Sequence, residues 1–392
     1  MRRLQRTVVA LGALVALGAH ASAPSKAAAG DPLCLSSYGG AAPRAGAPLR
    51  FGVDPGLAGS VGGAQLPSVP DDPASDLKAA RALRPRGHQL VVRLNRLFWS
   101  EGDAGIARFH RQIRAYSRAG FEVEIQVRYH PAAGEVGNLA AWERYVRRVV
   151  DRLGANRRVI AMTITNEVNL TFSPNTSDGY YRGARDALIG GIEAARSEAQ
   201  RRGFRWLKFG FTFAYRFLPT EDAAFFSYLG ARGGAAFHRA LSFVGLDFYP
   251  GTVYPPVMLP GDSYRAETAQ ALGSMRDCFM PLAGIGADTP IWITENGVPT
   301  GLLSDAQQAA ALRELVLAVH DYSGTFGVTD YRWFNLRDSV AGGIAPLVGI
   351  TFSSDGLLRS DYAPKQSFST YRSLIATLGA RSKRISRRHH RH

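Results

Sequence analysis

The chain has 392 residues, of which 46% are hydrophobic and 20% are charged, and such a chain can bury a full core. Its length allows two or three ordinary domains or one large barrel. Two cysteines exclude a disulfide-rich scaffold, an iron–sulfur protein and a four-cysteine zinc domain. The formal charge of +15 would point to nucleic-acid binding if it lay on the folded body.

Much of that positive charge lies at the two ends of the chain. Three arginines stand in residues 1–6, and six basic residues stand in residues 381–392. Without these nine charges, +6 of the +15 is left on the rest of the chain. A nucleic-acid enzyme more often carries a basic stripe on its body, so we expect no nucleic-acid partner. We predict that residues 380–392 form a disordered basic tail.

Residues 1–21 have the features of a secretory signal peptide. A basic start is followed by an apolar run over 7–19 and by the small-x-small cleavage site Ala19-His-Ala21. The run is shorter than the ~20 residues of a membrane span, and no later segment is long enough. We therefore expect a secreted protein with no membrane span. An uncleaved anchor is the alternative.

Residues 22–48 are rich in Ala, Pro and Gly and are expected to form a linker or N-terminal arm. Secretion would permit a disulfide between Cys34 and Cys278, which would attach this arm to the body of the protein. Two separate buried thiols are the alternative.

Apolar runs typical of strands follow, and helical patterns separate them. Strands are predicted at 50–53, 89–95, 121–127, 159–165, 207–213, 241–247, 290–294 and 329–334. Apolar residues at helical spacing predict helices at 103–119 and 138–153, each followed by a glycine. A third helix is predicted from the capping box of Ser304 and Gln307 to about Tyr322. A fourth is predicted over 364–378, between a proline and a glycine.

Strands that alternate with helices indicate an α/β protein with a parallel sheet. Eight such units over residues 49–379 fit a single closed (β/α)8 TIM barrel with insertions. A doubly wound sheet is the alternative, but it would favour a Gly-rich first turn that the sequence lacks. We expect one barrel domain, acting as a monomer.

The active site of a (β/α)8 barrel lies at the C-terminal ends of its strands. Asn166 and Glu167 follow the fourth strand, and Glu295 follows the seventh. Both glutamates emerge from apolar strands, and such burial raises a carboxyl pKa unless a cation or donor opposes it. Two facing carboxyls about 5–5.5 Å apart suit double displacement at a sugar carbon. A salt-bridged structural role is the alternative for either one.

Aromatic residues at other strand ends could form a sugar-binding surface. Trp333 ends the eighth strand, where its indole could stack on a sugar ring. Tyr249 follows the sixth strand and could donate a hydrogen bond to a carboxylate. Trp99 and Tyr129 stand at the ends of the second and third strands. The alternative for each is a core position.

This arrangement of Asn-Glu after strand four, Glu after strand seven and Trp after strand eight resembles clan A of the glycoside hydrolases. It is similar to the family 5-type retaining β-glycosidases. The resemblance covers about residues 50–378 and is strongest in 164–168 (ITNEV) and 292–297 (WITENG). It implies that Glu167 is the acid/base and that Glu295 is the nucleophile.

The resemblance also implies substrate-binding roles. Asn166 would hold the sugar 2-hydroxyl, Tyr249 would orient the nucleophile, and Trp333 would form the floor of the reactive subsite. Arg93, in the segment Val92-Arg-Leu94, would lie beside the nucleophile and keep it ionised. His130 stands near a histidine position of some members.

The sequence lacks the motifs that are typical of other classes of enzyme. There is no His-Glu-x-x-His, no Cys-x-x-Cys, no phosphate loop and no Gly-x-Ser-x-Gly. We therefore expect no metal and no cofactor, and we expect carboxyl groups to do the acid/base work. The leading hypothesis is a secreted retaining glycoside hydrolase that cleaves a β-linked oligo- or polysaccharide. A non-catalytic carbohydrate-binding barrel at a cell wall or surface is the alternative, as is an adhesion protein with a basic tail.

Overall fold

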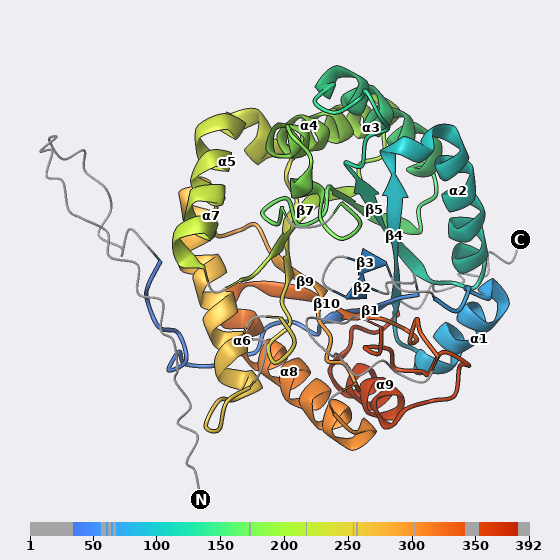
Figure 1. Cartoon of the computed structure of the whole chain (residues 1–392), viewed down its shortest axis with the longest axis vertical. Helices are drawn as coiled ribbons and strands as arrows, with labels where there is room; N and C mark the ends of the chain where they lie inside the picture. Colours follow the sequence, from blue (N-terminus) through green and yellow to red (C-terminus); the bar gives the residue numbers. More distant parts are fainter. Residues whose placement is uncertain are drawn as a thin grey trace, which may run out of the picture.

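A computed structural model describes residues 34–55, 60–61, 64–65, 68–171, 174–216, 218–253, 255, 258–301, 303–341 and 353–382. Within them, eight parallel strands close into a barrel in the order β1-β10-β9-β8-β7-β6-β5-β4 (Figure 1). The strands are β1 Arg50–Asp54, β4 Val91–Phe98, β5 Glu122–Arg128, β6 Val159–Ile164, β7 Lys208–Ala214, β8 Phe243–Asp247, β9 Ile291–Glu295 and β10 Val328–Phe334. The prediction of a single (β/α)8 TIM barrel is confirmed.

Helices surround the barrel as an outer ring (Figure 1). The longer helices are α1 Pro73–Leu83, α2 Gly102–Arg118, α3 Leu139–Leu153, α4 Ala184–Arg202, α5 Pro219–Ala240, α6 Tyr264–Gly273, α8 Asp305–Phe326 and α9 Gln366–Leu378. Short elements are the hairpin β2 Ser60–Val61 and β3 Ala64–Gln65, the single turns η1 Trp99–Glu101 and η2 Asp178–Tyr180, η3 Ser274–Phe279 and α7 Met280–Leu282. None of the helices in the described part is long and apolar enough to cross a membrane.

Two predicted helix ends differ from the structure. The capping box of Ser304 and Gln307 is present, but α8 continues four residues beyond Tyr322, to Phe326. It stops at Gly327, whose φ of +71° suits a glycine at a helix C-terminus. Helix α9 begins at Gln366 instead of residue 364, because Pro364 forms a bridge with Leu358 just before the helix.

A row of charged side chains lies inside the barrel, and we call it the axial ion-pair chain. Asp330 pairs with Arg332 at 2.8 Å, and Arg332 pairs with Glu124 at 3.1 Å. Glu124 pairs with Arg93 at 3.4 Å, and Arg93 pairs with Glu295 at 2.8 Å. A buried charge is costly unless it is paired, and each member of this row has an oppositely charged neighbour.

The N-terminal arm is attached to the outer ring of helices. A disulfide joins Cys34 to Cys278, with Cα atoms 5.6 Å apart, which is the first of the two alternatives for these cysteines. Further along the arm, the backbone N–H of Tyr38 donates to Gln270 Oε1 at 2.9 Å. The described part of the predicted linker, 34–48, is therefore fixed to the barrel. The predicted signal peptide and most of the predicted tail lie outside the described residues.

Candidate active site

An unusual backbone conformation directs the first glutamate from the end of β6. Thr165 and Glu167 both have a positive φ, +68° and +44°, a region that few residues other than glycine adopt. The backbone N–H of Glu167 donates to Thr212 Oγ1 at 3.0 Å, and the N–H of Thr165 donates to the carbonyl of Val127 at 2.8 Å. Neighbouring strands thus hold this turn in place, as is common where strain serves a site.

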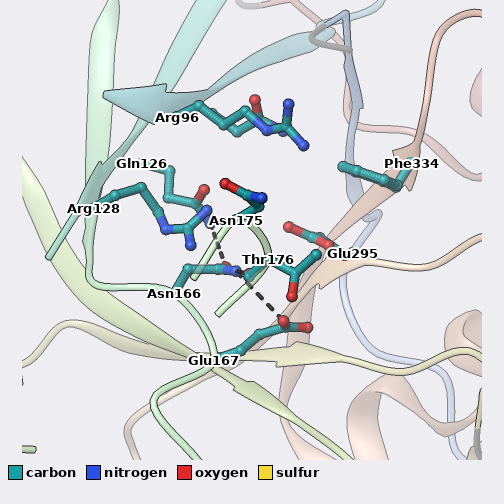
Figure 2. A pocket seen from close by; sticks show the side chains of 10 residues that line it. Arg96, Gln126, Arg128, Asn166, Glu167, Asn175, Thr176, Glu295 and Phe334 are labelled. Carbon is teal, nitrogen blue, oxygen red and sulfur yellow. Dashed lines mark hydrogen bonds between the residues drawn. The ribbon is translucent and has the colours of Figure 1, made fainter. Parts of the chain in front are cut away.

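Glu167 and Glu295 share one pocket at the C-terminal end of the barrel (Figure 2). Carboxylate oxygens of the two residues lie within 4.8 Å of each other. The enclosed part of this pocket is small, about 50 Å³, and it opens to solvent. Its lining residues are Asn95, Arg96, Gln126, Arg128, Asn166, Glu167, Asn175, Thr176, Glu295 and Phe334. The sequence prediction that the two carboxyls meet in a common cavity is therefore confirmed.

Two strong donors surround Glu295. Arg93 Nη1 donates to Glu295 Oε1 at 2.8 Å, and the Tyr249 hydroxyl donates to Oε2 at 2.8 Å. Charge-assisted hydrogen bonds of this kind are stronger than neutral ones and fix the direction of a carboxylate. Both oxygens of Glu295 are thus held, and the predicted positions of Arg93 and Tyr249 beside this carboxylate agree with the structure.

Glu167 has a weaker set of contacts. Asn166 Nδ2 lies 3.5 Å and Ser177 Oγ lies 3.4 Å from its Oε2. Burial, followed by the negative charge of Glu295, raises the pKa of Glu167 to about 8. The pair is therefore asymmetric: Glu295 is held by a cation and a hydroxyl, whereas Glu167 keeps its proton at neutral pH. Two carboxyls whose environments differ in this way divide acid and nucleophile roles between them.

A third carboxyl, Asp247, completes the cluster. One oxygen of each of Asp247, Glu167 and Glu295 lies within 4.8 Å of the others, which makes them the group with metal-ligand geometry among the described residues. Thr294 Oγ1 donates to Asp247 Oδ1 at 2.6 Å. Burial, and next the charges of Glu295 and Glu167, raise the pKa of Asp247 well above its usual range.

The amide of Asn166 is fixed on both sides. Its Oδ1 accepts from Gln126 Nε2 at 2.5 Å and from Thr212 Oγ1 at 2.9 Å, and its Nδ2 donates to the carbonyl of Thr176 at 2.7 Å. Asn166 lines the pocket beside Glu167 (Figure 2). This position suits the predicted contact with a sugar hydroxyl.

The prediction that Trp333 stacks on a sugar is wrong. Its side chain is fully buried, and its indole Nε1 donates to the carbonyl of Asp355 at 2.9 Å. Successive side chains of a strand point to opposite faces. Arg332 points into the barrel, so Trp333 points outward, where it packs against Tyr371 of α9. The next inward residue, Phe334, lines the pocket instead.

Trp99 and His130 also lie away from the pocket lining. Trp99 is stacked on Tyr129, with ring centroids 5.6 Å apart, and belongs to the hydrophobic core. His130 packs against Phe98 at a centroid distance of 4.6 Å. The residues of the preceding strand β5 that reach the pocket are Gln126 and Arg128. The predicted substrate-binding roles of Trp99 and His130 are therefore corrected to packing roles.

Sequence reasoning missed several pocket residues. The strand at 122–128 reads EVEIQVR, and its polar residues at every second position mark the face toward the barrel interior. That alternation could have identified Gln126 and Arg128. Nothing in the sequence around Arg96 distinguishes it from the many surface arginines. Phe334 could be identified only with the register of β10.

Comparison with solved structures shows the same fold in glycoside hydrolases. The chain is similar to a family 1 β-glucosidase from Thermotoga maritima, with 15% identity and a TM-score of 0.57, over 78% of this chain and 86% of that chain. It is also similar to GH5_18 from Bifidobacterium longum subsp. longum in complex with Manβ1-4GlcNAc, with 16% identity and a TM-score of 0.56, over 86% and 80%. A GH5_18 from Bifidobacterium longum subsp. infantis has 15% identity and a TM-score of 0.58, over 85% and 80%.

These likenesses are of fold. They agree at that level with the resemblance to clan A that the motifs indicate, and they leave the family open. No protein-family model and no curated protein matches the chain.

Proposed function

We propose that this protein is a secreted glycoside hydrolase that cleaves a β-linked glycan with retention of anomeric configuration. One observation carries the proposal: carboxylate oxygens of Glu167 and Glu295 lie within 4.8 Å of each other in one pocket. Retaining enzymes have carboxyls about 5–5.5 Å apart, whereas inverting enzymes leave about 6.5–9.5 Å for a water. A non-catalytic carbohydrate-binding barrel is expected to have a wider or blocked pair, so the spacing favours the enzyme.

In the first step, Glu295 attacks the anomeric carbon and the bond from that carbon to the leaving oxygen breaks. Glu167 gives its proton to this oxygen, which leaves as a hydroxyl. Arg93 and Tyr249 orient Glu295 for the attack through their two hydrogen bonds. The product of the step is a glycosyl ester of Glu295 together with an ionised Glu167.

In the second step, water enters the place of the leaving group. The ionised Glu167 takes a proton from this water while the water oxygen bonds to the anomeric carbon. The ester bond to Glu295 breaks, which restores the carboxylate and leaves Glu167 protonated again.

Secretion is part of the proposal. The predicted signal peptide supports it, and so does the Cys34–Cys278 disulfide, because disulfides persist in oxidising compartments outside the cytosol. We propose that the protein acts as a monomer, since one chain supplies both carboxyls and the whole lining of the pocket.

The test begins with a screen of chromogenic glycosides, β-linked polysaccharides and Manβ1-4GlcNAc, the ligand of the GH5_18 structure. Hydrolysis by the natural chain and its loss in Glu295→Ala are expected. Azide added to Glu167→Ala should give a β-configured glycosyl azide, because azide replaces the water of the second step. An α-configured azide would contradict retention. Binding of glycans without any turnover would favour the carbohydrate-binding barrel.

A further inference from the structure

Two arginines line the pocket without sufficient partners. Arg128 is 2% exposed, and its Nε donates to Asp178 Oδ1 at 2.7 Å. Its buried Nη2, however, has no hydrogen-bond partner among the described residues. A guanidinium N–H that is buried and unpaired is costly, which indicates that something absent from the protein itself satisfies it.

Arg96 is the second arginine. It is half-buried and lies within β4, where the pairing with β5 shifts register between Leu94 and Leu97, and its φ is +64°. Within the described residues its guanidinium makes no hydrogen bond or ion pair; its carbonyl accepts from Arg108 at 3.4 Å. Figure 2 shows its side chain directed across the pocket on the same side as Arg128, with the amide of Asn175 between them.

The nearby carboxylates are already engaged with other donors. Asp54 accepts from Arg93 at 3.3 Å and from Asn95 at 2.7 Å, and Glu295 is held as described above. Asp178 accepts from the backbone N–H groups of Tyr129 and Asn166 as well as from Arg128.

The two arginines also oppose each other. Burial, and next the positive charge of Arg128, lower the pKa of Arg96, while Asp54, Glu295 and Asp71 act in the opposite direction at longer range. An anion bound between the two arginines would relieve this repulsion.

We propose that Arg96 and Arg128 bind an anionic substituent of the glycan, so that the substrate is an acidic glycan. The inference rests on the proposed function, because it assigns the substrate class of the same pocket. The planar fork of arginine matches carboxylate, sulfate and phosphate oxygens in a bidentate manner. Asn175 and Thr176, which also line this side, offer further polar contacts to a sugar.

Binding is measured by calorimetry with Glu295→Gln, which keeps the glycan intact. Three arms identify the source of the charge: uronate oligosaccharides with their carboxyl-reduced counterparts, and sulfated and phosphorylated oligosaccharides with their unmodified counterparts. We expect one charged member to bind roughly 10–100-fold more tightly than its neutral counterpart, as hydrogen bonds to charged groups allow. Equal affinity for every charged and neutral pair would overturn the proposal.

The role of Arg96 is tested by adding Arg96→Gln to the Glu295→Gln variant. This change should abolish the difference in affinity between the charged member and its neutral counterpart, whereas Arg96→Lys should retain part of that difference. Arg114→Gln, on the exposed face of α2, removes one positive charge away from the pocket and is the matched control. The basic tail is present in every variant, so its attraction for polyanions cancels. A preference that survives Arg96→Gln unchanged contradicts the assignment.

The same set of glycans separates this inference from the proposed function. Hydrolysis of charged and neutral members at equal rates by the natural chain would keep the glycosidase and reject the acidic substrate. Arginine-dependent binding of a charged member without hydrolysis would keep the anion site and reject the glycosidase.

Discussion

Arg93 Nη1 lies 2.8 Å from Glu295 Oε1, and this arginine is completely buried in the barrel. Its other contacts are with Glu124 and Asp54, at 3.4 Å and 3.3 Å. The guanidinium of Arg93 is thus held beside the carboxylate of Glu295, the proposed nucleophile, by neighbours that are themselves charged. The remaining donor to Glu295, the Tyr249 hydroxyl, can be removed without disturbing this buried cluster.

Tyr249→Phe should lower kcat by about tenfold or more and change KM little. The variant keeps the aromatic ring, whose centroid lies 6.3 Å from that of Phe334. It removes one hydrogen bond that orients Glu295. Steady-state kinetics on the best substrate measure the effect. Tyr145→Phe, which removes a hydroxyl that donates to the carbonyl of Phe98 outside the pocket lining, is the matched control. Equal kinetics in the two variants would reject the orienting role of Tyr249.

Activity should decline as the pH rises through about 8. In the proposed mechanism Glu167 must carry a proton to assist the leaving oxygen, and burial, followed by the charge of Glu295, raises the pKa of Glu167 to about 8. The protonated form is therefore abundant below that pH and is lost above it. The pH profile of kcat/KM measures this decline. A dinitrophenyl glycoside needs no proton for departure, so its profile should lack the alkaline decline; a decline near pH 5 instead would contradict the assignment.

Glu167→Gln should raise the melting temperature by an amount that increases with pH. The pKa of Glu167 is higher in the folded protein, about 8, than the ordinary 4.5 expected when unfolded. Between these values the unfolded chain releases the proton more readily, so the natural protein loses stability as pH rises. Glutamine has no proton to lose. Thermal unfolding at pH 4.5 and pH 8 should show little difference at the former and a gain of a few degrees at the latter; an equal difference at both would reject the shift.

Phe334 and Trp333 should have opposite mutational phenotypes. Phe334→Leu removes the aromatic wall of the pocket but keeps an apolar side chain of similar size, so it should reduce kcat/KM by about tenfold with a small loss of stability. Trp333→Phe removes the hydrogen bond to Asp355 and leaves a cavity against α9, so it should lower the melting temperature with little effect on kcat/KM. Kinetics and thermal unfolding of both variants measure the contrast, and a large loss of kcat/KM in folded Trp333→Phe would restore its predicted role.

Replacing Cys34 and Cys278 with serine should destabilise the protein without abolishing turnover. The bond spans 244 residues of sequence, and removing a disulfide that closes a long loop costs about 2–5 kcal/mol. Neither cysteine lines the pocket that holds the carboxyls. Denaturant unfolding gives the stability and steady-state assays give the activity. Unchanged stability would show that the disulfide contributes nothing to the stability of the fold.

The strands and the two glutamates could be predicted because they depend on local pattern. Each buried parallel strand is an apolar run, and Glu167 and Glu295 stand where such runs end. The role of Trp333 could not be fixed in this way. If the register of β10 shifts by one residue, Trp333 and Phe334 exchange their inward and outward orientations. Both residues are apolar, so the sequence is compatible with either orientation.

The roles proposed for Arg96 and Arg128 in the pocket could be recognised only from the three-dimensional structure. Arg128 has a signal in the alternation of its strand, but its unsatisfied Nη2 is visible only when the neighbours of the side chain are known. Arg96 has a positive φ at an irregularity within β4, and no pattern in the surrounding sequence predicts that irregularity. A count of charges in the sequence does not separate these two arginines from the other basic residues of the chain.

The axial ion-pair chain links the candidate active site to the closure of the barrel. Its members Asp330, Arg332, Glu124, Arg93 and Glu295 belong to strands β10, β5, β4 and β9. In a folding intermediate in which β10 has not yet docked, Glu124 would lack its contact with Arg332. Glu124 could then draw Arg93 away from Glu295. Turnover would then be a late-appearing property during refolding, a reporter of the moment at which the ring of strands becomes complete.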